Sequence, residues 1–214
     1  MRTEEIAAFL GSRDAPPVLT AGHIKQLVGR GASGATASRV TRRLIEIGAI
    51  QKAMRGIFRN ASKPSDLGAI LPYVIPGGVL SLATVLGDDG VANNLTPNLH
   101  VVVSMENRGN VHNRTLTDGS RILVHRIPQR LMGFGIETSR GYNRAEPERA
   151  LCDWLYLAAS PHSRLREVPD DLDLEMLDMD KVRGYAARFG VEQELDGLVE
   201  RVRLAEEATD NAPF

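Results

Sequence analysis

Apolar residues recur every three or four positions in three short segments near the start of the chain, which places them on one face of an α-helix. We predict helices at Thr3–Leu10 with Thr3 as N-cap, directly after Thr20 as a second N-cap, and at residues 36–47. The apolar positions are Ile6, Phe9 and Leu10, then Ile24, Leu27 and Val28, and finally Ala37, Val40, Leu44 and Ile47.

A short β-hairpin is predicted directly after the third helix. Residues 49–54 and Ile57–Asn60 read as strands, and Arg55-Gly56 between them supplies the turn, because glycine accepts the required backbone geometry. Helix, turn, helix and basic hairpin form the pattern of a winged helix-turn-helix, in which one helix enters the DNA major groove and the hairpin contacts the backbone. We therefore predict such a domain over residues 1–63.

The remainder is predicted to be a second domain, residues 67–214, after a hinge of small and polar residues at 61–66. Pro147 in a first turn opens the most apolar helix of the chain, Pro147–Ala159, and Trp154 is expected in its buried stripe. Strands are predicted at Leu99–Ser104, Arg121–Ile127 and residues 131–138, with a short helix at 80–86, a loop at 87–98 and an acidic, mostly helical stretch at 170–208. The predicted fold class is α+β: a winged helix-turn-helix followed by a mixed α/β C-terminal domain with a helical C-terminal segment.

Charge is distributed unevenly along the chain. Residues 1–63 carry a net charge of +7, residues 64–165 of zero, and residues 166–214 of −8. The asymmetry favours a nucleic-acid-binding end over the alternative of ordinary solvated faces, because the basic residues coincide with the predicted helix and hairpin. The candidate DNA-binding residues are Ser38, Arg39, Arg42 and Arg43 on the outer face of the third helix, and Lys52, Arg55 and Arg59 on the hairpin.

No pattern in the sequence indicates an enzyme, a cofactor or a metal site. His100, His112 and His125 lack the helical spacing of metal ligands, and the single cysteine, Cys152, excludes a disulfide or a thiolate cluster. The first ten residues contain no long apolar stretch, and no segment approaches the roughly 18 apolar residues that span a bilayer. We therefore expect a cytoplasmic protein that has no membrane partner.

Three stretches give the chain a resemblance to a known family. "RLIEIGAIQKAMRGIFRN" is similar to that family's Arg-Gly-aromatic wing, and "GVLSLATVLGDDG" to the short helix that opens its C-terminal domain. The most specific stretch, "GYNRAEPERALCDWLYL", is similar to its Ala-x-Pro-Glu-Lys/Arg-Ala-Leu-x-Asp signature. On these motifs the chain resembles the AbiEi family of antitoxins from bacterial type IV toxin–antitoxin systems, over most of residues 20–160.

The resemblance implies a DNA-binding antitoxin. The N-terminal domain would bind inverted repeats in the promoter of its own operon and repress it. The C-terminal domain would counter a cognate nucleotidyltransferase-like toxin, generally without a stable complex, and Pro147, Glu148, Arg149 and Asp153 are its candidate antitoxin surface. From the residues alone, the alternative is that Glu148, Arg149 and Asp153 form surface pairs along one helix, since Arg149 and Asp153 are four positions apart.

A second class of function stays open at this point. The chain is alternatively a stand-alone winged-helix transcriptional regulator, whose C-terminal domain senses a small ligand or mediates assembly. A neighbouring gene for a nucleotidyltransferase-like protein would favour the antitoxin. A large apolar pocket with convergent polar groups would favour the regulator.

Overall fold

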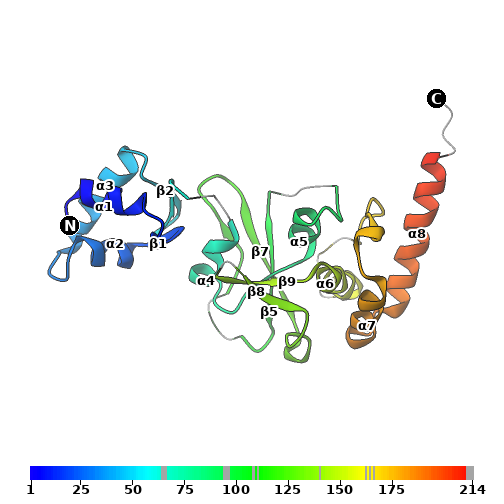
Figure 1. Cartoon of the computed structure of the whole chain (residues 1–214). Coiled ribbons are helices and arrows are strands. Elements are labelled where there is room, and N and C mark those ends of the chain that lie inside the picture. Colours follow the sequence, from blue (N-terminus) through cyan, green and yellow to red (C-terminus); the bar gives the residue numbers. More distant parts are fainter. Residues whose placement is uncertain are drawn as a thin grey trace. The chain divides into compact units, whose positions relative to one another are not determined.

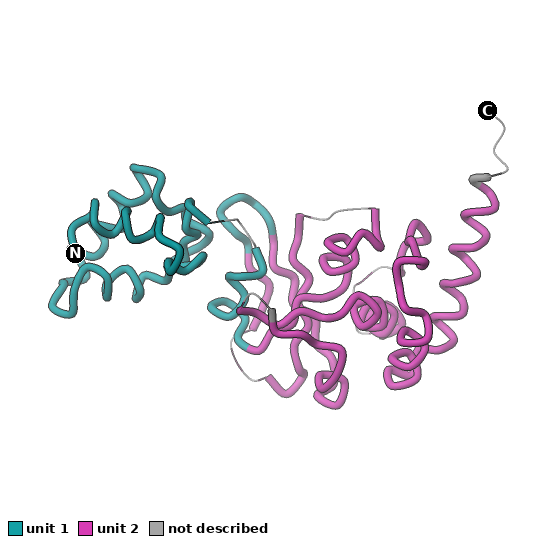
Figure 2. The backbone as a smooth tube through the Cα atoms, viewed as in Figure 1, with its two compact units in different colours: residues 1–76, 115–120 teal, residues 77–114, 121–214 magenta. Residues whose placement is uncertain are grey.

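The computed structural model describes residues 1–63, 67–93, 97–107, 109, 111–139, 141–161, 163, 165 and 167–210. The chain divides into two compact units, which Figure 2 colours separately. Unit 1 comprises Met1–Pro76 and Thr115–Ser120, and unit 2 comprises Gly77–Arg114 and Arg121–Phe214. Residues 64–66 of the expected hinge lie outside the described residues. Unit 1 thus continues past residue 63 and includes a segment from much later in the chain.

Unit 1 combines short helices with a three-stranded antiparallel sheet (Figure 1). Its strand order is β1-β3-β2, so β3 is central and pairs with both neighbours. The elements are α1 (Thr3–Leu10), β1 (Val18–Thr20), α2 (Ala21–Val28), α3 (Gly34–Glu46), β2 (Ile50–Met54), β3 (Ile57–Asn60), the 3-10 helix η1 (Leu67–Ile70) and α4 (Leu71–Val74). The core of helices and sheet consists of Ile6, Leu10, Leu19, Ile24, Leu44, Ile50 and Phe58.

Of the two predicted N-caps in unit 1, one is confirmed and the other is wrong. Thr20 caps α2 as predicted, since its Oγ1 accepts a hydrogen bond of 3.1 Å from the backbone N–H of His23. The prediction that Thr3 caps α1 is wrong, because Thr3 is the first helical residue and Arg2 is the N-cap. The backbone N–H of Arg2 instead donates to Glu5, 2.9 Å away.

Strand β1 was not predicted, although it completes the sheet. Val18 and Leu19 are buried, and Val18 to Thr20 pair with Arg59 to Ile57 of β3. A strand of three residues has too few positions to show alternation, so its pairing depends on a partner about forty residues away. At the end of β3 the buried Asn60 links the end of α1 to the loop before β1, since its Nδ2 donates to the carbonyl oxygens of Leu10 and Pro16.

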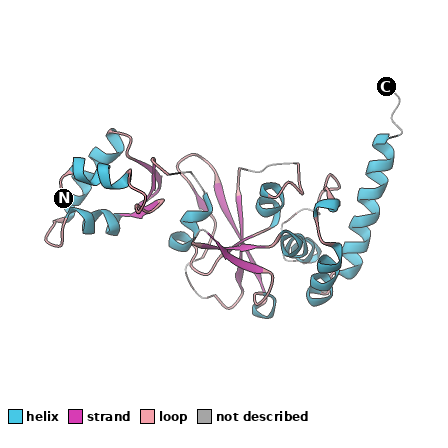
Figure 3. Ribbon diagram, viewed as in Figure 1, coloured by secondary structure: helices cyan, strands magenta, loops and turns pink. Residues whose placement is uncertain are grey.

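Unit 2 contains a six-stranded mixed sheet with the order β6-β7-β5-β4-β9-β8 (Figure 3). Pairs β5–β7 and β4–β9 are parallel, whereas β4–β5 and β8–β9 are antiparallel. The elements are β4 (Val79–Leu80), α5 (Leu82–Asp88), β5 (Leu99–Ser104), β6 (Arg114–Thr115), β7 (Arg121–Ile127), the 3-10 helix η2 (Gln129–Leu131), β8 (Ile136–Ser139), β9 (Tyr142–Ala145), α6 (Pro147–Ala159), the 3-10 helix η3 (Leu174–Met176), α7 (Met179–Phe189) and α8 (Glu192–Asp210). The predicted α+β class is therefore correct.

The strand predictions succeeded where the apolar run was long. Strands β5 and β7 have the predicted bounds, and the consecutive buried valines of β5 reflect a strand covered on both faces. The strand predicted at residues 131–138 exists but begins five residues later than expected. A 3-10 turn, η2, ends at Leu131, and β8 begins only at Ile136, after Gly135 with a φ of 60°.

Helix α6 has the predicted bounds and lies between α5 and α7 (Figure 1). Leu151 and Leu155 are buried as expected, but the prediction that Trp154 lies in the core is wrong, because its side chain is only half-buried. The acidic stretch forms α7 and α8 as predicted, and Asp178 caps α7 by accepting from two backbone N–H groups. Among the described residues, no helix is both long and apolar enough to cross a membrane.

Replacing Asn60 by alanine should lower the free energy of unfolding by about 1–3 kcal/mol, because the carbonyls of Leu10 and Pro16 lose their buried donor. Chemical denaturation of the full chain measures this. Gln51→Ala, an exposed change on the adjacent strand, is the matched control and should alter stability by less than about 0.5 kcal/mol. Equal effects of the two changes would contradict the assigned role.

Candidate functional site

Helix α3 presents one polar, basic face to solvent. Ser33 caps its start, with Oγ accepting from the backbone N–H of Thr36 at 3.1 Å, while Ala37 and Leu44 fix the inner face. All four sequence candidates on this helix are exposed: Ser38, Arg39, Arg42 and Arg43. Ile47, predicted for the inner stripe, lies beyond the helix end and is 47% exposed.

The arginines of α3 differ in how they are engaged. Nη1 of Arg43 lies 3.2 Å from Glu46, and both side chains are more than half exposed, so the pair contributes at most about 1 kcal/mol. Within the described part of the chain, Arg39 and Arg42 have no ion-pair partner. These two guanidinium groups therefore provide unneutralised positive charge on the outer face.

The basic hairpin, residues 50–60, carries two further exposed cations. Gly56, with a φ of 77°, makes the turn between β2 and β3, and both Lys52 and Arg55 are exposed. Arg59 does not join them. Its side chain is only 17% exposed, and Nη2 lies 2.7 Å from the carboxylate of Asp118.

The signature on α6 is buried, which corrects its expected place on the surface. Arg149 and Asp153 are both 0% exposed, Glu148 is 8% exposed, and only Pro147, in the first turn, is half-buried. The interpretation of Arg149 and Asp153 as an exposed pair is equally wrong. Their four-residue spacing does bring them together, since Arg149 Nε donates to Asp153 Oδ2 at 3.2 Å.

Arg149 and Asp153 also bind groups from other parts of unit 2. The hydroxyl of Ser81, just before α5, donates to Asp153 Oδ2 at 2.7 Å. Arg149 Nη1 donates to the carbonyl of Phe134. The guanidinium lies 5.0 Å from the ring centroid of Phe134 and 5.2 Å from that of Phe189, within cation–π range. The pair thus joins α6 to the start of α5, to the loop before β8 and to α7.

Burial of this pair is costly, and its hydrogen bonding is incomplete among the described residues. Arg149 Nη2 and Asp153 Oδ1 are buried without a hydrogen-bond partner there. Burial raises the pKa of Asp153 to about 6, against the opposing influence of Arg149 and Ser81. Each charge therefore depends on the other to offset its desolvation.

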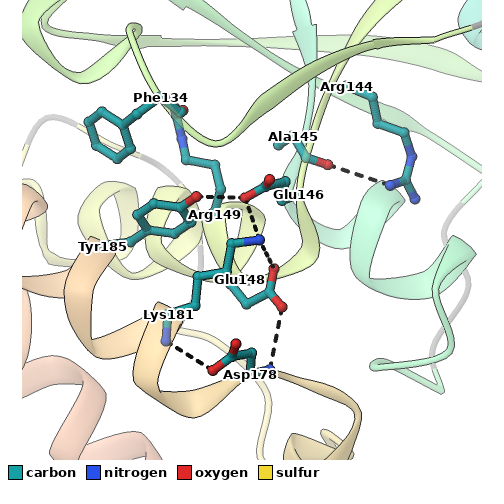
Figure 4. Close-up of polar contacts among 9 residues, drawn as sticks. All are labelled: Phe134, Arg144, Ala145, Glu146, Glu148, Arg149, Asp178, Lys181 and Tyr185. Atoms are coloured by element: carbon teal, nitrogen blue, oxygen red, sulfur yellow. Dashed lines mark hydrogen bonds and ion pairs between the residues drawn. The ribbon is translucent and has the colours of Figure 1, made fainter.

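A second polar cluster lies around the N-terminal end of α6. It consists of Glu146, Glu148, Lys181 and Tyr185 (Figure 4). Lys181 Nζ lies 2.9 Å from Glu146 and 3.8 Å from Glu148, and the Tyr185 hydroxyl donates to Glu146 at 2.6 Å. Burial acts to raise the pKa of Glu146, but the bonds from Tyr185 and Lys181 outweigh it and lower that pKa. This cluster holds the start of α6 to α7.

Sequence reasoning did not find Ser81, Phe134, Lys181 or Tyr185 as partners of the signature. They lie between 15 and 72 residues away from their partners along the chain, on elements whose proximity only the fold creates. The backbone directly after Ser81 has an unusual conformation, at Leu82. Leu82 is the only non-glycine residue with a positive φ among the described residues, at 53°.

Two of the three candidate histidines form a pair on neighbouring strands. His100 Nδ1 and His125 Nε2 are 3.1 Å apart, and the two stacked rings are within 3° of parallel. One of these nitrogens donates to the other, and the tautomers decide which. Burial lowers the pKa of both to about 4, and His112 is exposed. No group of three or more histidine, cysteine or acidic residues able to hold a metal ion occurs among the described residues.

A cavity of about 470 Å³ opens beside this pair in unit 2. Leu123, His125, Leu157 and Ser160 contribute to its walls. The Arg126 guanidinium, also in its wall, already donates to the carbonyls of Asn107 at 3.1 Å and Val111 at 3.2 Å. The volume is in the range of small-molecule sites, but this cation is engaged by the protein itself.

Comparison with solved structures shows a likeness of fold. No family model matches the chain, and no curated protein matches it. Among solved structures, the crystal structure of the RV2827C protein from Mycobacterium tuberculosis is similar, with a TM-score of 0.51 and 16% sequence identity. The match covers 93% of this chain and 80% of that chain, so the two share a fold along most of their lengths.

Replacing Arg149 by methionine should lower the free energy of unfolding by about 3–5 kcal/mol, because Asp153 is then left buried without its counter-charge. Lys181→Met, which removes a more exposed ion pair on the facing helix, should cost less than about 1 kcal/mol. Adding Asp153→Leu to Arg149→Met should recover part of the loss. A normal unfolding midpoint for Arg149→Met alone would show that the pair contributes nothing.

The histidine pair should make stability depend on pH between 4 and 6.5. The unfolded imidazoles take up protons below about 6.5, whereas the folded ones stay neutral to about pH 4, so stability is lost as the pH falls through this window. Asp153, whose pKa is raised, acts in the opposite sense. His125→Gln isolates the pair: the stability difference between parent and variant should shrink by about 2–3 kcal/mol from pH 6.5 to 4. A difference that stays constant from pH 6.5 to 4 would refute the assignment.

Proposed function

We propose that unit 1 is a winged helix-turn-helix that binds duplex DNA, with α3 in the major groove. The observation that carries this proposal is the exposed face of α3, which bears Ser38, Arg39, Arg42 and Arg43 in consecutive turns. The order α1-β1-α2-α3-β2-β3, with a hairpin directly after α3, supports it. In this proposal the hairpin is the wing, and Lys52 and Arg55 contact phosphates.

The chemistry of the face suits DNA. A planar guanidinium donates two parallel hydrogen bonds to guanine O6 and N7, and Arg39 and Arg42 have no ion-pair partner within the described residues. Cations near the backbone release condensed counterions, so such binding weakens steeply with salt. Because one helix reads few base pairs, we propose an inverted repeat of two half-sites as the target.

For the whole chain we propose a DNA-binding antitoxin that represses its own operon and counters a cognate nucleotidyltransferase-like toxin. The resemblance of the three sequence stretches to AbiEi antitoxins supports this proposal. The burial of Arg149 and Asp153 shifts its residue assignment, since a toxin or its target would meet the half-buried Pro147, Glu146 and Lys181 instead. The buried pair then supports that surface from within.

The cavity beside His125 is the observation that favours the second candidate, a stand-alone regulator that senses a small ligand. The two candidates share DNA binding and differ in unit 2. Neutralisation of a toxin distinguishes them, because a ligand sensor has no reason to protect cells from the product of a neighbouring gene.

DNA binding is tested with the full chain, because unit 1 includes Thr115–Ser120. Arg42→Ala should weaken binding to the operon's own promoter by about 1–3 kcal/mol and relax base preference at one position. Arg55→Ala should weaken all duplexes alike and reduce the salt slope by about one. Arg183→Ala, an exposed change in unit 2, is the control. Unchanged binding by both Arg42→Ala and Arg43→Ala would mean that α3 is not the recognition helix.

Antitoxin activity is tested by co-expression with a neighbouring nucleotidyltransferase-like gene and a count of surviving cells. Arg42→Ala should lose repression but still protect the cells, since it leaves unit 2 intact. The Lys181→Met variant should still repress the operon but no longer protect the cells, if the N-terminal end of α6 is the antitoxin surface. Cells that die equally with and without the parent protein would leave only the regulator.

A further inference from the structure

Strand β2 of the basic hairpin has an irregularity at Ala53. Pairing shifts there, because Lys52 faces Phe58 whereas Met54 faces Ile57. A bulge of this kind leaves one residue outside the regular ladder and bends its strand. Ala53 is fully buried. Its carbonyl oxygen must therefore find a partner outside the regular β2–β3 ladder.

Thr117 supplies that partner. Both its backbone N–H and its hydroxyl donate to the Ala53 carbonyl, at 2.8 Å and 2.9 Å. Thr117 belongs to the docked segment, Thr115–Ser120, which is part of unit 1 although it follows Ala53 by more than sixty residues (Figure 2). The bulge that directs the end of the hairpin is thus held by a residue that is not in the hairpin.

Asp118 makes a second contact, to the neighbouring strand. Its Oδ2 accepts from Arg59 of β3 at 2.7 Å, while Oδ1 accepts from the backbone N–H of Ser120 at 3.1 Å and from the Ser120 hydroxyl at 2.5 Å. Gly119, with a φ of 87°, and the bond from Leu116 N–H to the Ser120 carbonyl close a tight turn. The carboxylate is therefore already oriented when it meets Arg59.

The docked segment contacts the sheet on the face away from the helices. Phe58 belongs to the core shared with the helices, and successive side chains of a strand point to opposite faces, so Arg59 projects from the other face. One segment thus binds β2 through Ala53 and β3 through Arg59. Lys52 directly precedes the bulge residue Ala53, and Arg55 lies in the turn of the hairpin just after the bulge.

We propose that Thr117 and Asp118 are positioning residues for DNA binding, which set the direction of the basic hairpin so that Lys52 and Arg55 meet the phosphates of duplex DNA. Arg59 is the anchor for this contact and not a phosphate ligand. The inference rests on the proposed function, because it assigns the hairpin to the DNA backbone. The opposing idea is that Asp118 masks Arg59 from DNA, in which case removing the carboxylate would strengthen binding.

The first experiment needs no DNA. Amide hydrogen exchange of the full chain is compared between the parent, Thr117→Val, Asp118→Asn and the double variant. Exchange in residues 50–57 should rise about threefold to tenfold for each side-chain hydrogen bond removed, the factor of one net hydrogen bond, while α1 and α2 stay unchanged. The backbone N–H of Thr117 still donates to Ala53 in every variant. Glu106→Gln removes an exposed acid of unit 2 and should change nothing in the hairpin. Unchanged exchange of the hairpin in the double variant would overturn the positioning role.

The second experiment measures the salt dependence of binding to the promoter duplex. In the parent, Arg55→Met should lower the slope of log affinity against log salt by about one. The double variant Thr117→Val/Asp118→Asn should lower that slope by about two, and Arg55→Met in that background should lower it no further, because the hairpin no longer reaches the backbone. Arg59→Met should behave like Asp118→Asn.

Two results would overturn the inference. Tighter binding by Asp118→Asn than by the Glu106→Gln control would show that Asp118 masks a phosphate ligand. A full effect of Arg55→Met in the double variant would show that the hairpin is placed independently of Thr117 and Asp118. If the parent bound no duplex at all, the proposed function would fail instead, and the exchange experiment would still decide whether the segment orders the hairpin.

Discussion

The buried ion pair between Arg149 and Asp153 is the interaction on which the organisation of unit 2 depends. Both side chains have lost all contact with solvent, and an isolated charge in that position would be strongly destabilising. The pair is tolerated because Ser81, the Phe134 carbonyl and two aromatic rings surround it. Those groups come from separate elements, so the ion pair specifies where α5, α6, α7 and the loop before β8 must meet.

The charged signature on α6 serves the interior of unit 2. A motif of charged residues in a helix suggests an exposed binding surface, yet here its central charges are internal. Its outer members, Glu146 and Glu148, bind Lys181 and Tyr185 of α7 and hold the two helices together. The resemblance to AbiEi antitoxins therefore rests partly on residues whose structural role is to form the fold that presents a surface.

Unit 1 shows the opposite arrangement of charge. Arg39 and Arg42 project from α3 without an ion-pair partner among the described residues, and Lys52 and Arg55 are exposed on the hairpin. Leaving such groups in water costs little in folding, because they keep their hydration until an anionic partner replaces it. Arg59 is the exception. It stabilises the contact between β3 and the docked segment, so the same residue type serves the fold at one position and is open to a ligand at others.

The sequence by itself determined the elements whose information is local. Helices α2, α3 and α6, the long strands β5 and β7, and the exposure of the four α3 candidates follow from spacing, capping and charge within a few residues. Tertiary structure alone decided the three-residue β1, the two-residue β4, the half-burial of Trp154, the burial of Arg149 and Asp153, and the capture of Arg59 by Asp118. Each of these depends on a partner distant in the chain, and periodicity reports only which face of an element a residue occupies. It does not report what covers that face, and for charged residues this decides whether they bind solvent, a ligand or the interior of the protein.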